Sequence, residues 1–152
     1  MRNGWADLEL GIRMLGWRIA IGPLKALVPL ARLVRLMHKS PQARDRRSTR
    51  EARIVSLSDR LCRGRLREGS CLERSLLAYR FLSEAGAAPT LVVAVRQGSD
   101  MLEWHAWVTR DRRPVQETDE SLRGYLPVLI FGPHGALEWS SSTAESLADV
   151  RL

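Results

Sequence analysis

Hydrophobic periodicity changes once along the chain, at Pro89. Before it, apolar residues recur at helical spacing, whereas after it they gather in short runs rich in β-branched residues and separated by turns. The 152 residues are enough to bury one core of ordinary size without disulfide or metal support. The sequence therefore predicts an α+β fold in one compact domain, with helices first and an antiparallel sheet after them.

The N-terminal third of the chain is expected to be a basic helical region followed by a linker. Its apolar pattern is interrupted near Pro23 and at Pro29, so two or three helical pieces are expected. Residues 39–50 carry no aliphatic side chain larger than alanine apart from a proline, which predicts the linker. We therefore divide the chain into residues 1–50, helical region and linker, and residues 51–152, the core. The apolar positions of the first piece include Leu8, Ile12, Leu15 and Ile19.

A cysteine stands at the predicted start of a later helix. Ser70 and Glu73 match a capping box, in which two side chains satisfy each other's free backbone N–H groups. The helix is therefore expected to begin at Cys71 and to end near Ala85-Gly86, where glycine can adopt the left-handed conformation. Because the helix dipole and the first-turn N–H groups favour anionic sulfur, Cys71 is the candidate nucleophile.

A histidine follows on a predicted strand. Strand composition is found at residues 90–97, 102–109, 114–118 and 126–131, and the first three of these runs are predicted to form an antiparallel meander. Side chains alternate along a strand, so His105 shares one face with Glu103 and Trp107. His105 is the candidate base for the cysteine.

Turn length decides which side chain faces His105. A three-residue turn after the second strand sets Glu117 directly opposite His105, near enough for a carboxylate to hold the imidazole. A two-residue turn would oppose Thr118 to His105 instead. Asp111 at the turn tip and Asp119 beyond the strand are the alternative acids, and both rank below Glu117.

The composition excludes several classes of protein. Two cysteines form no disulfide framework and three widely spaced histidines form no metal-ligand cluster, so neither a zinc site nor another metal site is expected. The N-terminus lacks a signal-peptide pattern and the most apolar stretch is interrupted by basic residues, so a cytoplasmic location is expected. The net charge of +7 fits either an anionic partner or an arginine-rich proteome bias.

Three further residues are candidates for contact with a substrate. Trp104 and Trp107 are candidates for lining a cleft, with core packing as the alternative. Arg74 is a candidate for meeting substrate, although bracing of its own helix is the expected role. The second cysteine, Cys62, is expected to be buried and inert.

Three segments resemble the transglutaminase-like cysteine proteases of lasso-peptide biosynthesis: Cys71–Tyr79, Ala88–Arg96 and His105–Val108. The order of cysteine, histidine and acid is also similar to that of the wider papain and transglutaminase superfamily. The resemblance implies a papain/transglutaminase-like core, with a nucleophile helix packed on an antiparallel sheet, and a helical N-terminal region. Carried over by position, Cys71 would be the nucleophile and His105 the general base and acid, while Glu117 stands where the family usually has Asp.

The resemblance also implies a reaction and its partners. Cys71 would cleave the leader peptide from a lasso-peptide precursor through a thioester, with no cofactor. A separate leader-recognition protein and an ATP-dependent macrolactam synthetase, the cyclase, would be its partners. Two alternatives stay open: a transglutaminase-like acyltransferase, and a non-catalytic basic protein that binds peptide, membrane or nucleic acid. Nucleic acid is not expected because no known binding motif is present, whereas peripheral membrane contact is compatible with the basic helices.

Overall fold

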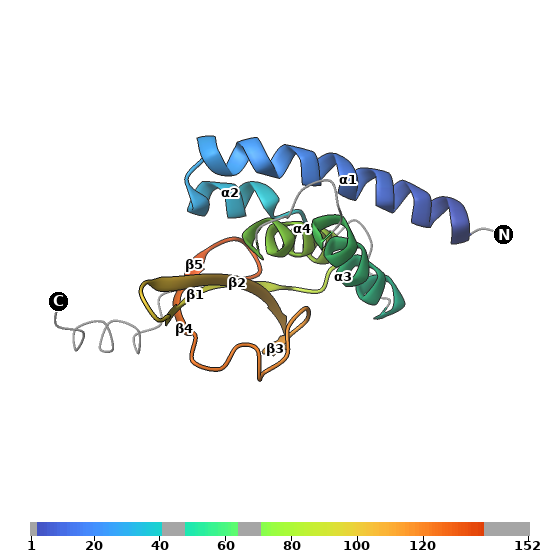
Figure 1. Ribbon diagram of the computed structural model, residues 1–152. Helices are drawn as coiled ribbons and strands as arrows, with labels where there is room; N and C mark the ends of the chain where they lie inside the picture. Colours follow the sequence, from blue (N-terminus) through green and yellow to red (C-terminus); the bar gives the residue numbers. More distant parts are fainter. Residues whose placement is uncertain (1–2, 41–47, 64–70, 139–152) are drawn as a thin grey trace.

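The α+β fold is confirmed. The computed structural model describes residues 3–40, 48–63 and 71–138, in which four helices precede a five-stranded sheet (Figure 1). The predicted N-cap residue, Ser70, lies outside the described residues. The helices and strands are α1 (Asn3–Leu27), α2 (Leu30–Met37), α3 (Ser48–Arg63), α4 (Cys71–Glu84), β1 (Thr90–Gln97), β2 (Leu102–Arg110), β3 (Arg113–Pro114), β4 (Leu126–Phe131) and β5 (Leu137–Glu138).

Helix α4 is the centre of the molecule. It lies between the sheet and the N-terminal helices α1 and α2, with α3 alongside it (Figure 1). Leu91, Val108 and Phe131, from three adjacent strands, are at most 1% exposed and join α4 in one hydrophobic core. The same core includes Met14 and Leu33 from the first two helices. The described part of residues 1–50 therefore shares its core with the rest of the chain.

Helix α1 is apolar on two opposite faces. Leu10, Met14 and Ile21 belong to the hydrophobic core and are at most 7% exposed. The apolar positions that we listed from the sequence for this helix, such as Ile12 and Ile19, lie on its opposite face and are exposed. Only one of the two faces is covered by described residues.

The break predicted near Pro23 is wrong, whereas the break at Pro29 is confirmed. Helix α1 runs through Pro23 to Leu27, and α2 begins after Pro29. A proline inside a helix removes one hydrogen bond from the carbonyl four residues earlier, here that of Ile19. Both Pro23 and Ile19 are exposed, so water can hydrate that carbonyl and the helix continues.

Both ends of α4 agree with the prediction. The helix begins at Cys71 and ends at Glu84. Gly86 has a φ of 79°, and its N–H donates to the Ser83 carbonyl at 3.0 Å while the Ala87 N–H donates to the Leu82 carbonyl at 3.0 Å. These two bonds form a Schellman motif, which ends the helix.

The sheet has the strand order β3-β2-β1-β4-β5 and is antiparallel throughout. The predicted runs 90–97, 102–109 and 126–131 are strands. The predicted strand 114–118 is wrong in extent, because β3 ends at Pro114. The meander holds for β1 to β3, after which the chain returns to pair β4 with the other edge of β1.

The turn between β2 and β3 has two residues, so the second of the two turn lengths that we considered is present, and the three-residue turn that would oppose Glu117 to His105 is not. Arg110 pairs with Arg113, and the intervening Asp111 and Arg112 have φ values of 51° and 63°. Two successive residues at positive φ are typical of a type I′ turn, whose twist matches that of the flanking strands. This turn and the short β3 decide how much of the β2 edge stays uncovered.

Candidate active site

The first two turns of α4 dock against the outer edge of β2. The Ser75 hydroxyl donates to the Ala106 carbonyl at 2.9 Å, and the Ala106 backbone also hydrogen bonds to the Cys71 sulfur. Ala106 therefore directs its backbone N–H and C=O away from β1, along the part of the edge that two-residue β3 does not reach. Because an uncovered strand edge needs hydrogen-bonding partners, this edge fixes α4 at the residue beside His105.

His105 hydrogen bonds to Cys71. The imidazole packs between two aromatic rings: Trp107, stacked at 6.0 Å between centroids, and Tyr125, tilted at 5.3 Å. Its Nε2 contacts Glu117, so Nδ1 is the nitrogen left for the sulfur. The aromatic packing and these polar contacts hold the ring between the cysteine and the acid.

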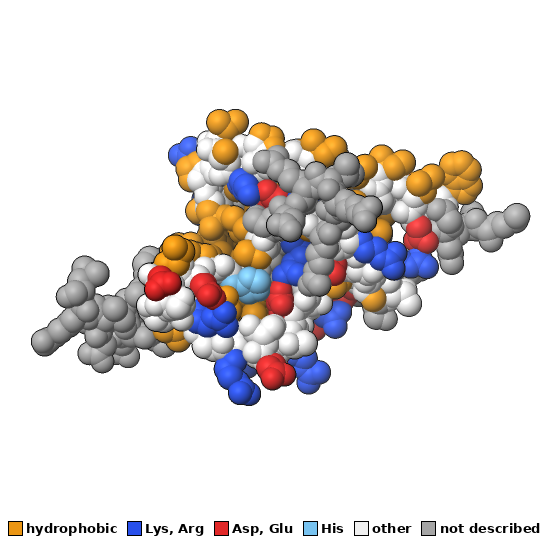
Figure 2. All heavy atoms as spheres, in the orientation of Figure 1, with side chains coloured by type: hydrophobic (Ala, Val, Ile, Leu, Met, Phe, Trp, Pro, Cys, Tyr) orange, Lys and Arg blue, Asp and Glu red, His pale blue; other side chains and the backbone are white. Residues whose placement is uncertain are grey.

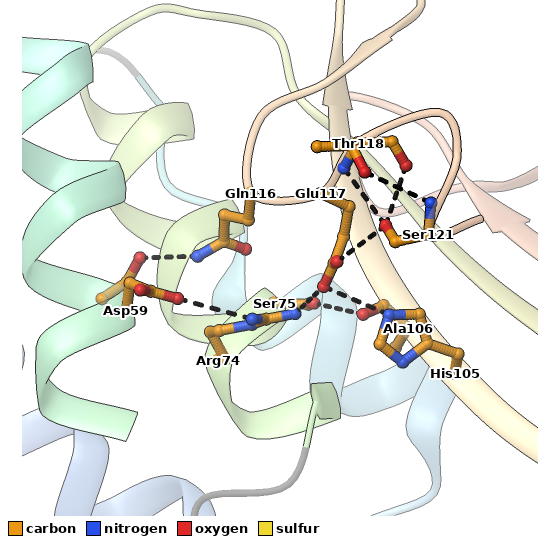
Figure 3. A network of polar contacts seen from close by, with 10 residues as sticks. Asp59, Arg74, Ser75, His105, Ala106, Gln116, Glu117, Thr118 and Ser121 are labelled. Atoms are coloured by element: carbon orange, nitrogen blue, oxygen red, sulfur yellow. Dashed lines mark hydrogen bonds and ion pairs between the residues drawn. The ribbon is translucent and has the colours of Figure 1, made fainter. Parts of the chain in front are cut away.

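Glu117 is held by three side chains (Figure 3). Its Oε1 lies 3.2 Å from Nε2 of His105 and also accepts a hydrogen bond from Nη2 of Arg74. Ser121 donates to Oε2 at 3.2 Å. Only 13% of the Glu117 side chain is exposed. The carboxylate therefore has a defined orientation toward His105.

The electrostatics favour a thiolate and an imidazolium. Burial raises the pKa of Cys71, but the hydrogen bond with His105, those with the Ala106 and Leu72 backbone, and the charge of His105 together bring it below its usual value. The hydrogen bond with Cys71 raises the pKa of His105, burial opposes this, and the charges of Cys71 and Glu117 add to the increase. Thiolate and imidazolium therefore stabilise each other, as a nucleophile and its base require.

Arg74 keeps the acid ionised. Burial raises the pKa of Glu117, but the hydrogen bond and charge of Arg74, followed by the charge of His105, lower it below its ordinary value. Arg74 is itself only 7% exposed and also contacts Asp59 of α3 at 3.4 Å. This placement favours the bracing role over direct contact with substrate.

The two alternative acids are exposed, and the two candidate tryptophans differ in their burial. The side chain of Asp111 is 73% exposed at the turn tip and pairs with Arg110, and Asp119 is exposed. Trp107 is 7% exposed and packs with Val92 and Ala94 as well as His105, whereas Trp104 is 62% exposed. Core packing therefore describes Trp107, and only Trp104 offers a surface to a ligand.

Glu117 reaches His105 by a route that the sequence argument did not foresee. The β2–β3 ladder ends at Pro114, so Glu117 arrives on the loop after β3 and not from a paired strand position. The sequence argument also missed that Arg74 binds Glu117 and that Ser75 binds the edge of β2. Their positions three and four residues after Cys71 on one helix place all three on the same face, which was the available signal.

The remaining titratable candidates lie outside this constellation. Cys62 is 2% exposed, and burial raises the pKa of its thiol, as expected of an inert residue. His38 and His134 contact each other, with ring centroids 5.2 Å apart. No group of three or more metal-ligating side chains occurs among residues 3–40, 48–63 and 71–138. None of the helices within those ranges is long and apolar enough to cross a bilayer.

The helix-borne cysteine and the histidine on the adjacent strand both lie within the part of the chain that a family model matches. The family model of the transglutaminase-like superfamily matches residues 8–130, and the chain belongs to this superfamily. The match indicates chemistry of the cysteine-protease or acyltransferase type. No curated protein and no solved structure matches the chain.

Replacing Ser75 by alanine tests the docking of α4 on β2. Ser75→Ala leaves the buried Ala106 carbonyl without its hydroxyl donor, so we expect a loss of about 1–3 kcal/mol in the free energy of unfolding, measured by urea denaturation. The matched control is Ser83→Ala, because the Ser83 hydroxyl is also buried on α4 but has no hydrogen-bond partner in the described structure. An equal effect of the two substitutions would contradict the docking role.

Alkylation by iodoacetamide reports the ionisation of Cys71. In a Cys62→Ala background, reaction should persist to pH values below the ordinary thiol pKa, because only the thiolate reacts and the pKa of Cys71 is lowered. His105→Ala removes the largest lowering influence and leaves burial, which raises the pKa. The midpoint of the rate against pH should therefore rise. An unchanged midpoint would show that His105 does not stabilise the thiolate.

Proposed function

We propose that this protein is a cysteine peptidase that cleaves the leader peptide from a lasso-peptide precursor. The observation that carries the proposal is the chain of contacts from Cys71 at the start of α4, through His105, to Glu117. Membership of the transglutaminase-like superfamily supports the chemistry. The lasso-peptide substrate rests on the resemblance of the segments around Cys71, Ala88 and His105 to the leader peptidases.

The proposed reaction has two steps. The Cys71 thiolate attacks the carbonyl carbon of the bond between leader and core, and the electron pair of the C–N bond leaves with the core amine as His105 donates a proton to it. Water then attacks the thioester while His105 removes a proton from the water. The C–S bond breaks, which releases the leader acid and restores the Cys71 thiolate and the His105 imidazolium. The Cys71 backbone N–H, at a helix start, is the natural donor to the oxyanion.

Glu117 orients the histidine in this scheme. It holds Nε2 of His105, which leaves Nδ1 for the sulfur, and its charge stabilises the imidazolium. The glutamate is longer than the aspartate usual in the family, and both of its oxygens are anchored: Arg74 donates to Oε1, which faces the ring, and Ser121 donates to Oε2. These anchors limit the extra freedom of the longer side chain.

The edge of β2 supports an extended peptide as substrate. Along this edge Val108 accepts a hydrogen bond from Val115 at 3.1 Å, and Ala106 is bound by α4. Alternation makes Trp104 the next residue whose backbone points outward. A peptide that pairs with Trp104 would add a strand beside Cys71 and bring its backbone carbonyl toward the sulfur. Leu102 and Trp104 of β2, which are 50% and 62% exposed, offer apolar contacts to its side chains.

We propose that leader recognition is supplied in trans by a separate small protein and that the released core passes to the macrolactam synthetase, all in the cytoplasm. The enzyme would use no cofactor. Under the competing acyltransferase function, an amine and not water would take the thioester.

Cleavage of a precursor peptide in the presence of its leader-recognition protein tests the proposal. Cys71→Ala should abolish cleavage because no other thiol lies beside His105, whereas Cys62→Ala should retain it. Mass spectrometry of the products should show a free leader acid. Retained cleavage by Cys71→Ala would refute the nucleophile, and a leader that carries an added amine would establish acyl transfer instead.

The acid can be tested separately. Glu117→Ala should lower kcat by about 10²–10⁴-fold, whereas Asp111→Ala should leave it nearly unchanged. Because Glu117 raises the pKa of His105, its loss should also move the alkaline limb of the activity profile to lower pH. Glu117→Gln removes the charge and keeps the shape around Arg74, and it gives the same pH readout if the alanine variant is unstable. Equal effects at residues 111 and 117 would refute the assignment of the acid.

A further inference from the structure

Helix α1 carries a row of exposed apolar side chains on the face turned away from the core. We call this row the outer stripe, and hydrophobic side chains are seen along this helix in Figure 2. The members and their exposed fractions are Trp5 (78%), Leu8 (56%), Ile12 (62%), Leu15 (43%) and Ile19 (69%). A helix that is apolar on both sides is ordinarily covered on both, so the outer stripe requires a partner.

The spacing of the outer stripe indicates that the partner is a helix. Its members alternate at intervals of three and four residues, and Gly22 and Ala26 continue the alternation toward the end of α1. A strict repeat of 3.5 residues forms the narrow seam of two packed helices, whereas a helix on a flat apolar surface has a broader stripe of period 3.6. Trp5, Leu8 and Ile12 also line a shallow depression with Glu9 and Arg13, into which side chains of such a helix would fit.

The basic side chains of α1 argue against a lipid surface as the partner. Arg13 pairs with Glu84 at 2.6 Å, and Arg18 and Lys25 pair with Glu73 at 2.8 and 2.6 Å. These cations are directed toward α4, so they do not form the basic border with which interfacial helices bind anionic lipid.

We propose that a second copy of this chain covers the outer stripe, with the two α1 helices packed antiparallel about a two-fold axis. A two-fold interface must be complementary to itself, and an uncharged apolar row meets that condition. The register that uses the whole row places Leu8 opposite Ile19 and Ile12 opposite Leu15 of the second copy. Trp5 then lies opposite Gly22 of the second copy, where an added Cβ would meet nothing within 4 Å.

The charged residues that border the outer stripe fit the same register. Glu9 is exposed at a flanking position of the 3.5-residue repeat, where charges set partner choice. In the proposed pairing Glu9 faces Gly16 of the second copy. Arg18 flanks the stripe beside Gly11 of the second copy, but its guanidinium is turned toward Glu73 of α4, so like charges do not meet. Added Cβ atoms at these two glycines also meet nothing within 4 Å, which leaves room for close approach of the helices.

The contact area predicts a dimer of moderate strength. Five side chains of this size, each burying on the order of 100 Å², give a total of about 1,000 Å² over the two copies. This is near the lower limit for a specific interface, so we expect a concentration-dependent dimer with dissociation in the micromolar range.

Sedimentation velocity of the full chain tests the proposal over about 1–200 µM. Ile12→Glu should raise the dissociation constant at least about tenfold, since it puts two like charges at the centre of the interface. The control is Leu36→Glu on α2, an apolar residue that is 49% exposed and lies outside the stripe. Thermal melting by circular dichroism should show both variants folded, because neither side chain belongs to the core. A monomer at every concentration, or equal dimerisation of wild type and Ile12→Glu, would overturn the proposal.

Cross-linking tests the register. In a background of Cys62→Ala and Cys71→Ala, proteins with Leu8→Cys and Ile19→Cys are mixed and oxidised. We expect a mixed disulfide dimer, whereas Leu8→Cys alone should not cross-link, since eleven helical residues separate equivalent positions by about 16 Å. Absence of the mixed dimer would overturn the register. Binding of monomeric protein to anionic vesicles, lost in Ile12→Glu, would overturn the proposal in favour of a lipid surface.

Discussion

The candidate site depends on the docking of α4 against the uncovered edge of β2. The backbone of Ala106 has an N–H and a carbonyl with which no strand in the described part of the chain pairs, and the first two turns of α4 supply the partners. Since Ala106 follows His105 directly, satisfying this backbone brings Cys71 to the imidazole. The same hydrogen bonds that complete the sheet edge therefore hold the Cys71 sulfur beside the imidazole, and the short β3 leaves room for α4 at this edge.

The carboxylate of Glu117 is shared between two cationic side chains, Arg74 and His105. Glu117 interacts with the permanent charge of Arg74 as well as with His105. Among the influences that raise the pKa of His105, Cys71 exceeds Glu117. Glu117 therefore contributes mainly to the orientation of the ring, while the sulfur contributes most to its charge. Because the buried Arg74 also binds the carboxylate of Glu117, the carboxylate does not form an exclusive ion pair with His105.

Local signals in the sequence predicted more than long-range ones. Capping signals in the sequence predicted the start of α4 at Cys71 and its end just before Gly86, and strand alternation predicted the face of His105. The contact of Glu117 with His105 was predicted through a register that does not exist, because loop paths have no periodicity from which to infer them. The buried side of α1 was also beyond prediction, since both faces are apolar and only the position of α4 distinguishes them.

The ion pairs of α4 with α1 connect the two parts into which composition divides the chain. Glu73 and Glu84, near the two ends of α4, are each at most 6% exposed and interact with Arg18, Lys25 and Arg13 of α1. Separating residues 1–50 from the remainder would remove these cations together with the apolar side chains of α1 and α2 that share the core with α4. The environment of the helix that carries Cys71 is therefore built in part by α1, which lies on the other side of the composition boundary.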